Sequence, residues 1–505
     1  MNRSNIAMKN SFIGLVSQVI SIVLQFATRS VFIKYLGVEM LGLSSTFASV
    51  LGALSVAELG FQTAVTYHLY RPIVDGDNKT INDIINIYKL VYRCIGLFFI
   101  VASIVCIPLL PYIVKGIEVT NYIRCIFLVQ AAGSACTYFL AYKRSLLYAD
   151  QKAYVSTTID MVINIIANVL QIIVVVITRS YMLYLIIKVA QVYLSNVLVH
   201  IVCARRYPYL HKDSIDKVMF KKILSHVKDV FSSRISNYVY TSTDSLVISA
   251  IVGTIQVGFF NNYTIITNNI KIVANSITTP IAPIIGNLIA SDGEESQVKV
   301  FDLYNFLRFI ICGVLVLPIL VLAHRFIVLW IGEEYILSNV ILVLLCVDLY
   351  IHIMHTSCCD YIYGNGLFKI DKYISIFGAI LNLLISIIFV IKFGVVGVLI
   401  GKVTSQVYFW ISRSIITFKV CLKKGIREYL YYWFKQAIYS LLFVIIFALQ
   451  MMVSNIVYSL YNPIVSFIVS GVMCEVLFII LSVVGTFKFD ENKQCRGFVF
   501  KILKK

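Results

Sequence analysis

Four basic side chains lie deep inside long apolar stretches of this sequence, where a charge is costly. They are Arg29, Lys188, Lys271 and Lys402. On insertion scales, each such charge costs about 2.5 to 3.5 kcal/mol at the centre of a membrane helix. Because a charge that faces lipid has nothing to compensate it, we predict that these four side chains face a common polar cavity and bind an anionic group there.

Amide side chains recur at helical spacing beside these cations. Gln18 and Gln25 precede Arg29 on one face of the first predicted helix. We predict that six amides line the same cavity: Gln18, Gln25, Asn237, Asn261, Asn268 and Asn275. The alternative is that small polar side chains hold neighbouring membrane helices together, which requires no cavity.

Acidic side chains also occur inside the apolar stretches. Glu58, Asp160 and Asp244 are the candidates for coupling transport to an ion. The alternative is that these acids pair with the embedded cations and have a structural role. The sequence alone leaves both interpretations open.

One row of residues has the spacing of metal ligands. Asp348, His352, His355 and Cys359 follow one another at steps of four, three and four residues. No second conspicuous cluster in the sequence completes such a site. We therefore predict no metal.

The composition indicates what kind of protein must position these residues. Of the 505 residues, 59% are hydrophobic and 13% are charged. The sequence contains 43 Lys and Arg and 25 Asp and Glu, which gives a net charge of +18. A soluble protein carries about 25% charged residues, so the soluble classes are excluded. Because the sequence has no soluble domain to carry an exposed basic patch, we expect no nucleic-acid partner.

Apolar stretches long enough to cross a membrane follow one another along the chain. The sequence therefore predicts an all-α polytopic membrane protein with about fourteen transmembrane helices, and twelve is the alternative count. The predicted spans are residues 11–34, 40–66, 94–114, 124–147, 157–178, 181–203, 231–252, 256–286, 303–329, 335–363, 373–392, 394–418, 436–457 and 462–485.

The positive charges predict the orientation of these spans. Lys and Arg gather at the N-terminus and in the even-numbered connections, whereas the odd-numbered connections hold only Lys34, Lys115, Arg179 and Lys392. Connections rich in Lys and Arg stay in the cytoplasm. We therefore expect both termini to be cytoplasmic and the basic surface to meet anionic lipids of the inner leaflet.

An internal repeat predicts how the spans are grouped. The glycine step from Gly37 to Gly42 recurs from Gly253 to Gly258. Two halves with six spans each share one orientation, so they form parallel lobes around a central cavity. The predicted domains are an N-terminal lobe (1–203), a basic amphipathic cytoplasmic linker (204–229), a C-terminal lobe (230–418), an extra helix pair (419–485) and a basic cytoplasmic tail (486–505).

Short motifs spread over the whole chain resemble those of a known superfamily. They include Arg29-Ser30 before Leu36-Gly37, then Ala57-Glu58-Leu59-Gly60, Leu69-Tyr70-Arg71-Pro72, and Phe393-Gly394-Val395-Val396-Gly397. With these motifs the sequence resembles the polysaccharide flippases, of the O-antigen and capsule type, within the multidrug/oligosaccharidyl-lipid/polysaccharide exporter superfamily.

The resemblance implies a transporter of the bacterial cytoplasmic membrane, not an enzyme. It implies that undecaprenyl-pyrophosphate-linked oligosaccharide moves from the inner to the outer leaflet by alternating access, for lipopolysaccharide or capsule synthesis. Arg29 and Lys271 occupy positions whose basic residues meet the anionic headgroup in such flippases. A monomer that works beside a polysaccharide polymerase and glycosyltransferases is the expected arrangement.

The expected energy source is an ion gradient or the membrane potential, without a cofactor. The nearest match to a phosphate-binding loop runs from Gly397 to Thr404, but it has one residue too few between its glycines and has Val403 where Ser or Thr is needed. An ion-coupled multidrug or small-cation antiporter of the same fold is the alternative function. An antiporter of cations needs a cavity in which acidic side chains outnumber basic ones. The excess of deep cations in this sequence therefore argues against the antiporter.

Overall fold

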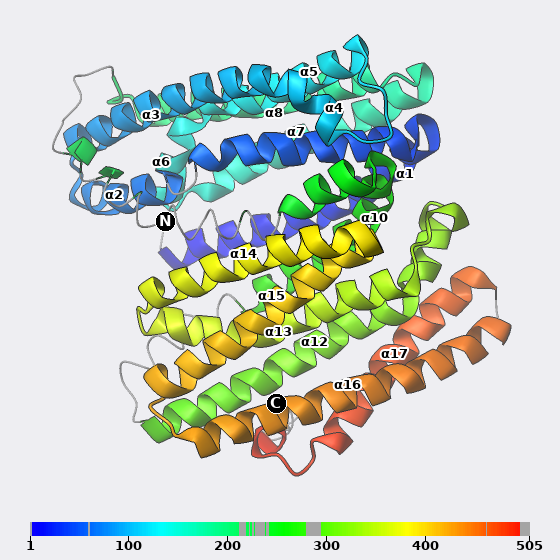
Figure 1. The fold of residues 1–505 in the computed structure, drawn as a ribbon. Helices are drawn as coiled ribbons and strands as arrows, with labels where there is room; N and C mark the ends of the chain where they lie inside the picture. Colours follow the sequence, from blue (N-terminus) through cyan, green and yellow to red (C-terminus); the bar gives the residue numbers. More distant parts are fainter. Residues whose placement is uncertain are drawn as a thin grey trace. The chain divides into compact units, whose positions relative to one another are not determined.

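The computed structural model describes residues 3–58, 61–211, 219–221, 223–224, 227, 238, 242–278, 294–460 and 462–494. Within these residues the protein is helical and has no strand, which confirms the predicted fold class (Figure 1). The longer helices are α1 (Arg3–Leu54), α2 (Phe61–Asp75), α3 (Asn78–Cys106), α5 (Asn121–Leu140), α7 (Ala153–Thr178), α8 (Tyr181–Arg206), α10 (Thr254–Thr278), α12 (Glu294–Trp330), α13 (Asn339–Gly364), α14 (Phe368–Phe393), α15 (Val395–Ile416), α16 (Ile426–Leu460) and α17 (Pro463–Gly485). Two short helices, α4 (Leu110–Ile113) and α6 (Arg144–Ala149), follow α3 and α5.

Eleven helices among the described residues are long and apolar enough to cross a membrane. The first of them, Phe12–Leu54 within α1, covers the first predicted span and the second one only as far as Leu54, because a turn and the separate helix α2 follow. The predicted seventh span is described only at residue 238 and over residues 242–252, and α10 covers the predicted eighth span as far as Thr278. The count is therefore consistent with about fourteen spans.

The connection expected between the first two spans is a break inside α1. At Gly37 the backbone has φ 82° and ψ 166°, outside the helical region, and the helix resumes at once. Glycine reaches positive φ without the steric cost that a Cβ imposes. The chain therefore passes from the first span to the second at a single residue.

The helix in which the predicted third span (94–114) starts begins well before residue 94. The helix α3 begins at Asn78, because the Asp77 side chain accepts hydrogen bonds from the backbone N–H of Thr80 (3.0 Å) and from its hydroxyl (2.6 Å). The preceding Gly76 turns the chain with φ 69°. These bonds hold the pKa of the exposed Asp77 carboxyl below its usual value, the hydroxyl bond being the larger cause.

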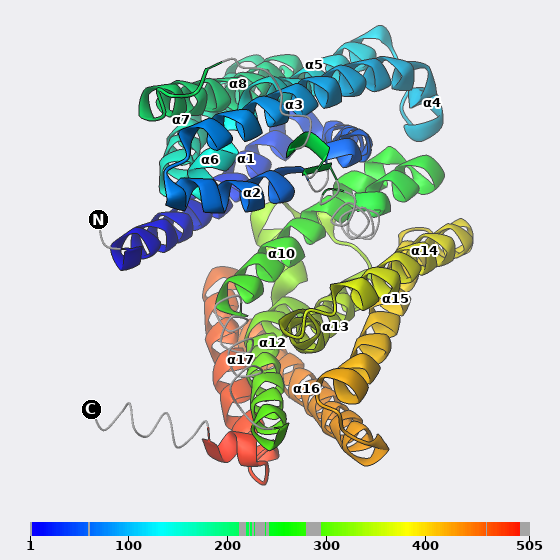
Figure 2. The same cartoon turned by 90° about the vertical axis from the view of Figure 1, so that its left-hand side faces the viewer.

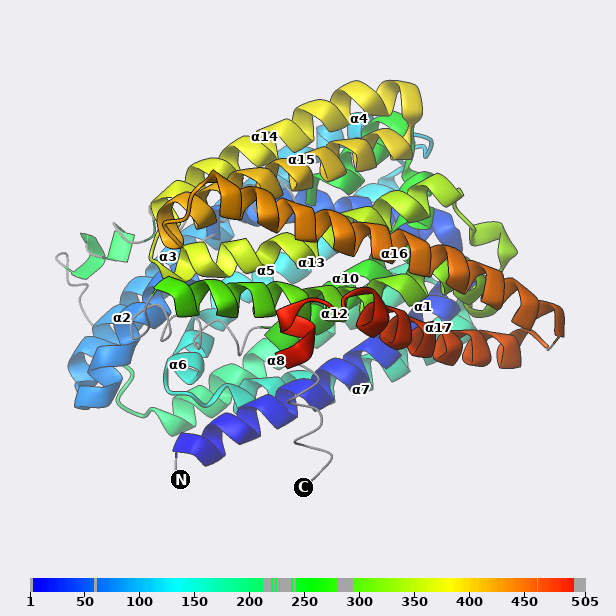
Figure 3. The same ribbon diagram turned by 90° about the horizontal axis from the view of Figure 1, so that it is seen from below.

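The chain divides into two compact units, Met1–Gly258 (unit 1) and Phe259–Lys505 (unit 2). In unit 1, α3 packs on α5, α5 packs on α8, and α8 packs on α7, which also contacts α1. In unit 2, α12 packs on α13, α13 packs on α15, and α15 packs on α14 (Figure 3). The same order of helix pairing in each unit agrees with the repeat that the sequence predicted.

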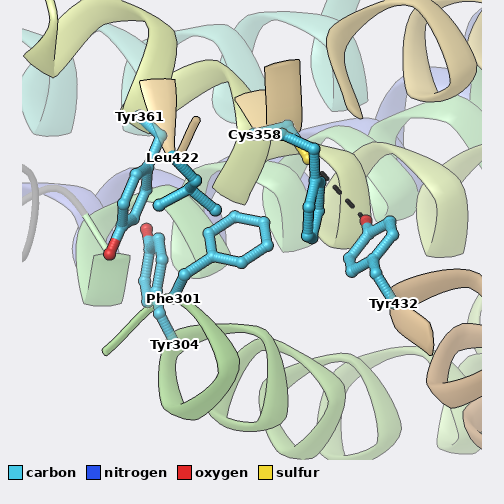
Figure 4. Close-up of a cluster of buried hydrophobic side chains, with 7 residues drawn as sticks. Phe301, Tyr304, Cys358, Tyr361, Leu422 and Tyr432 are labelled. Atoms are coloured by element: carbon cyan, nitrogen blue, oxygen red, sulfur yellow. Dashed lines mark hydrogen bonds between the residues drawn. The ribbon is translucent and has the colours of Figure 1, made fainter. Parts of the chain in front are cut away.

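Helix α16 packs on the rest of unit 2 through an aromatic core. A buried cluster (Figure 4) consists of Phe301, Tyr304, Cys358, Tyr361, Phe418, Leu422 and Tyr432. The Tyr432 hydroxyl on α16 accepts a hydrogen bond from Trp410 Nε1 on α15 (2.7 Å) and lies 3.7 Å from Cys358 Sγ on α13. This hydroxyl therefore connects three helices of unit 2.

A buried lysine of α16 also joins this helix to two other parts of unit 2. Lys435 Nζ lies 2.8 Å from Asp302 Oδ2 on α12 and 2.6 Å from Glu491 Oε1, in the segment after α17. Asn492, beside Glu491, donates to the carbonyl oxygen of Val483 at the end of α17 (2.8 Å). Figure 2 shows α12, α16 and α17 gathered in one group of helices.

Candidate functional site

Two adjoining cavities open among the membrane helices of unit 1. The first, which we name the Glu58 cavity, has a volume of about 420 Å³ and is lined by side chains of α1, α2, α3, α7 and α8, among others. The second, the Lys188 cavity, has a volume of about 350 Å³. Thr137 on α5 and Val192 on α8 line both, so the two cavities share a wall where these helices run side by side (Figure 1).

The Glu58 cavity contains an ion pair that the sequence did not predict. Arg144, at the start of α6, donates to both carboxylate oxygens of Asp160 on α7 (2.6 and 3.1 Å). Ser195 also donates to Asp160, and Asn196 accepts from Arg144 (3.3 Å). In the sequence Arg144 follows Lys143 near the end of the predicted span 124–147, where basic residues are expected in a cytoplasmic connection. The short turn at Ala141–Lys143 between α5 and α6 directs it into the cavity instead.

Glu58 lies against an aromatic wall of the same cavity. Its carboxylate accepts a hydrogen bond from the Tyr92 hydroxyl, and the Tyr92 ring packs against Tyr88 with 4.2 Å between ring centroids. Tyr138 on α5 lies behind Tyr92, with the ring centroids 5.9 Å apart. Two of the three predicted ion-coupling acids, Glu58 and Asp160, thus line one cavity.

Hydrogen bonds between polar side chains that line this cavity join three helices. Gln191 on α8 donates to Asn164 Oδ1 on α7 (3.0 Å), and Asn164 donates to the hydroxyl of Ser21 on α1 (3.4 Å). All three side chains line the Glu58 cavity. The predicted lining residues Gln18 and Gln25 are on the same helix as Ser21, but they line neither cavity.

Lys188 lines the second cavity, and Arg29 lies near it. Among the described residues that line this cavity, Lys188 is the one with an ionisable side chain. Its ammonium group is within electrostatic range of the Arg29 guanidinium, which also interacts with Tyr184. Unit 1 thus brings two of the four predicted cations together, although Arg29 itself lines neither cavity.

The other two predicted cations meet at one acid in unit 2. Lys271 Nζ on α10 lies 2.8 Å from Asp348 Oδ2 on α13, and Asp348 is 3% exposed. Lys402 on α15 interacts electrostatically with the same carboxylate. Both cations were predicted from the sequence, whereas their shared contact with Asp348 was not.

The row of possible metal ligands on α13 has other contacts. Gln406 donates from Nε2 to Asp348 Oδ1 (3.1 Å), and its Oε1 lies 2.9 Å from His355 Nε2. Among the residues that the structure describes, no three His, Cys, Asp or Glu side chains are grouped so that they could hold a metal ion. The side chains at this spacing form a network of an ion pair, an amide and a histidine.

The remaining predicted residues lie apart from the two cavities. On α10, Asn261 accepts a hydrogen bond from Thr264 (3.2 Å), while Asn268 and Asn275 are exposed. Asp244 is buried in the helical segment before Gly253. Asn237 and most of the linker 204–229 lie outside the described residues.

Long apolar helices, a repeated order of helix pairing and polar cavities among the helices define a multipass membrane protein. Residues 7–289, more than half of the chain, match the family described as "Polysaccharide biosynthesis protein", and the chain belongs to this family. No curated protein matches the sequence.

Solved structures share the fold at low sequence identity. A structure described as "Lipid II flippase MurJ, inward closed conformation" has a TM-score of 0.71 at 13% identity, over 95% of this chain and 99% of that one. An inward-facing multidrug resistance MATE family transporter of the MOP superfamily has a TM-score of 0.61 at 16% identity, over 80% of this chain and 96% of that one. Its outward-facing counterpart has a TM-score of 0.53 at 17% identity, over 81% of this chain and 93% of that one.

Proposed function

We propose that this protein flips an isoprenoid-pyrophosphate-linked oligosaccharide, most simply one built on undecaprenyl pyrophosphate, from the inner to the outer leaflet of the bacterial cytoplasmic membrane. The observation that carries the proposal is membership of the polysaccharide biosynthesis family over residues 7–289. The fold shared with the lipid II flippase supports it. Transport proceeds by alternating access, with both termini in the cytoplasm.

The polar side chains of the membrane helices suit such a substrate. A diphosphate that leaves water needs cations and hydrogen-bond donors in exchange for its hydration shell. Arg29 and Lys188 lie together in unit 1, and Lys271 and Lys402 lie together in unit 2. We assign these four cations to the anionic headgroup.

The energy source in this proposal is an ion gradient or the membrane potential. Glu58 and Asp160 line one cavity, where Tyr92 and Arg144 hydrogen-bond to them. A carboxylate with such partners can exchange a proton or a cation when its partner moves away. Glu58 is the better candidate of the two, because Arg144 already neutralises Asp160.

Mass spectrometry of co-purifying lipids tests the proposal. Wild-type protein extracted from its own membrane should retain an undecaprenyl-pyrophosphate-linked glycan, and the Arg29→Ala/Lys271→Ala double variant should retain less. The exposed Lys34, which lines neither cavity, provides the matched control Lys34→Ala. Absence of any such lipid from the wild type would overturn the proposal, and equal retention by the double variant would overturn the role of these two residues.

A second candidate function is ion-coupled antiport of drugs or small cations. The observation that favours it is the pair of acids in the Glu58 cavity, together with the fold shared with multidrug transporters. Proteoliposomes with an outward proton or sodium gradient distinguish the two functions. Accumulation of ethidium that depends on Glu58 would support antiport, whereas exposure of a lectin-reactive lipid-linked glycan supports the flippase.

A further inference from the structure

The two cavities of unit 1 differ in charge although they share a wall. The Glu58 cavity has two acids, Glu58 and Asp160, and one base, Arg144, among its described lining residues. The Lys188 cavity has a single ionisable side chain, Lys188, among the described residues that line it. The first lining therefore contains more acids than bases, whereas the second contains a base and no acid among its described residues.

This difference decides which cavity can accept a diphosphate. Like charges repel strongly where water is scarce, so a diphosphate is disfavoured next to Glu58. The Arg144 guanidinium does not reverse this, because both of its short bonds go to Asp160 (2.6 and 3.1 Å). Lys188 offers an ammonium group without an acidic neighbour among the described residues of its cavity.

The Glu58 cavity has instead the chemistry that recognises a sugar. Sugar hydroxyls donate to carboxylates and exchange hydrogen bonds with amides, and this lining offers Glu58, Gln62, Gln191 and Asn196. A volume of about 420 Å³ is in the range of small-molecule sites.

We propose that the two cavities divide the headgroup of the lipid-linked glycan between them: the Lys188 cavity receives the diphosphate, and the Glu58 cavity receives the sugar bonded to it. This inference rests on the proposed function. The shared wall of Thr137 and Val192 matches the covalent order of the substrate, in which the diphosphate and the first sugar are directly joined.

Binding of two lipid probes to the full-length protein in nanodiscs tests the division. The probes are undecaprenyl pyrophosphate and undecaprenyl pyrophosphate that carries one N-acetylhexosamine, and native mass spectrometry gives both dissociation constants. We expect the wild type to bind the sugar-bearing probe about tenfold more tightly, which corresponds to one or two good hydrogen bonds.

Three variants separate the two cavities. Gln62→Leu should abolish the preference for the sugar without weakening the sugar-free probe, because Gln62 is exposed and lines only the Glu58 cavity. Gln191→Ala is the second variant of that cavity, in case the first misfolds. Lys188→Gln should weaken the binding of both probes by the same factor, about tenfold, and leave the preference for the sugar-bearing probe unchanged. The matched controls are Asn78→Leu and Lys34→Gln, both at exposed positions that line neither cavity.

Each outcome distinguishes this inference from the proposed function. If the wild type binds neither probe, the proposed function fails and the division fails with it. If the wild type binds both probes equally, or if the Glu58-cavity variants weaken the binding of both probes equally, the flippase proposal stands. The division of the headgroup between the two cavities is then overturned. A loss of preference in Lys188→Gln would likewise overturn it.

Discussion

Gly42 and Gly258 face each other where the second half of α1 crosses the beginning of α10. A Cβ added at Gly42 would lie 2.0 Å from the carbonyl oxygen of Thr254 and 3.2 Å from the nitrogen of Gly258. A Cβ added at Gly258 would lie 2.5 Å from the carbonyl oxygen of Val38 and 3.2 Å from the nitrogen of Gly42. The two glycines that recur in the sequence repeat are therefore in reciprocal backbone contact.

Alanine at either of these glycines should destabilise the protein. Neither neighbour can move aside cheaply, because both are backbone atoms, and overpacking of this kind costs about 1 to 3 kcal/mol. Thermal unfolding in detergent of Gly42→Ala and Gly258→Ala measures the effect. Gly14→Ala on the same helix is the control, since its Cβ would meet nothing within 4 Å. Unchanged unfolding temperatures in the first two variants would contradict the close approach.

Removal of the cation from the Lys271–Asp348 pair should be costly. Lys271→Met leaves the buried Asp348 carboxylate without its closest partner, for which a loss of about 3 to 5 kcal/mol is expected. Lys271→Met/Asp348→Leu should regain only part of that loss, because the buried Lys402 then lacks the same carboxylate. Chemical denaturation in detergent measures both. A double variant that is stable but binds less lipid-linked glycan shows a binding role for these residues, while equal stability of wild type and Lys271→Met would refute the pairing.

The N-terminus of α3 should depend on pH through Asp77. Its folded-state pKa is lowered by the hydrogen bonds from Thr80, so its stabilisation is complete above the unfolded pKa of about 3.9 and is lost as the pH falls through the folded value. Amide exchange of residues 78–82, corrected for intrinsic rates, should therefore accelerate below about pH 4. Asp77→Ala should remove this dependence. Asp75→Ala should keep it, because Asp75 makes only an exposed pair with Arg71.

Tyr432→Phe should weaken the attachment of α16. The variant removes the acceptor of the Trp410 indole N–H, and a buried donor left unsatisfied costs about 1 to 3 kcal/mol. A double-mutant cycle with Trp410→Phe gives the coupling energy, which should be favourable. The exposed Tyr431 offers the control Tyr431→Phe. Additive effects of Tyr432→Phe and Trp410→Phe would show that this hydrogen bond has no energetic role.

Hydropathy and charge predicted the helical fold well, because a membrane span must be long and apolar. Helix ends were predicted less well where the sequence is polar. Residues 78–93 contain Lys79, Lys89 and Arg93, so the charge-free stretch begins only after them, yet the Asp77 cap starts α3 before them. The break at Gly37 is a backbone property of one residue, and no pattern of side chains distinguishes it from a short loop.

The site was predictable in its residue types but not in its partners. Deep cations indicate a polar interior wherever they occur, and the four predicted cations do lie in two groups. Arg144 was missed because residues beside Lys143 at the end of a span are normally cytoplasmic, and only the turn before α6 brings it to Asp160. Asp348 was noted for its spacing to His352, which is a property of one helix, whereas its partner Lys271 comes from another.

The ion pair between Lys435 and Glu491 has a consequence for the order of membrane insertion. Glu491 follows α17, so this pair forms only after α17 has left the ribosome and entered the bilayer. Until then α16 carries a buried lysine that has Asp302 as a partner but not Glu491. Docking of α16 on α12 is therefore completed late in synthesis, and a nascent chain stopped before Glu491 exposes an incompletely neutralised lysine to the cell's membrane quality control.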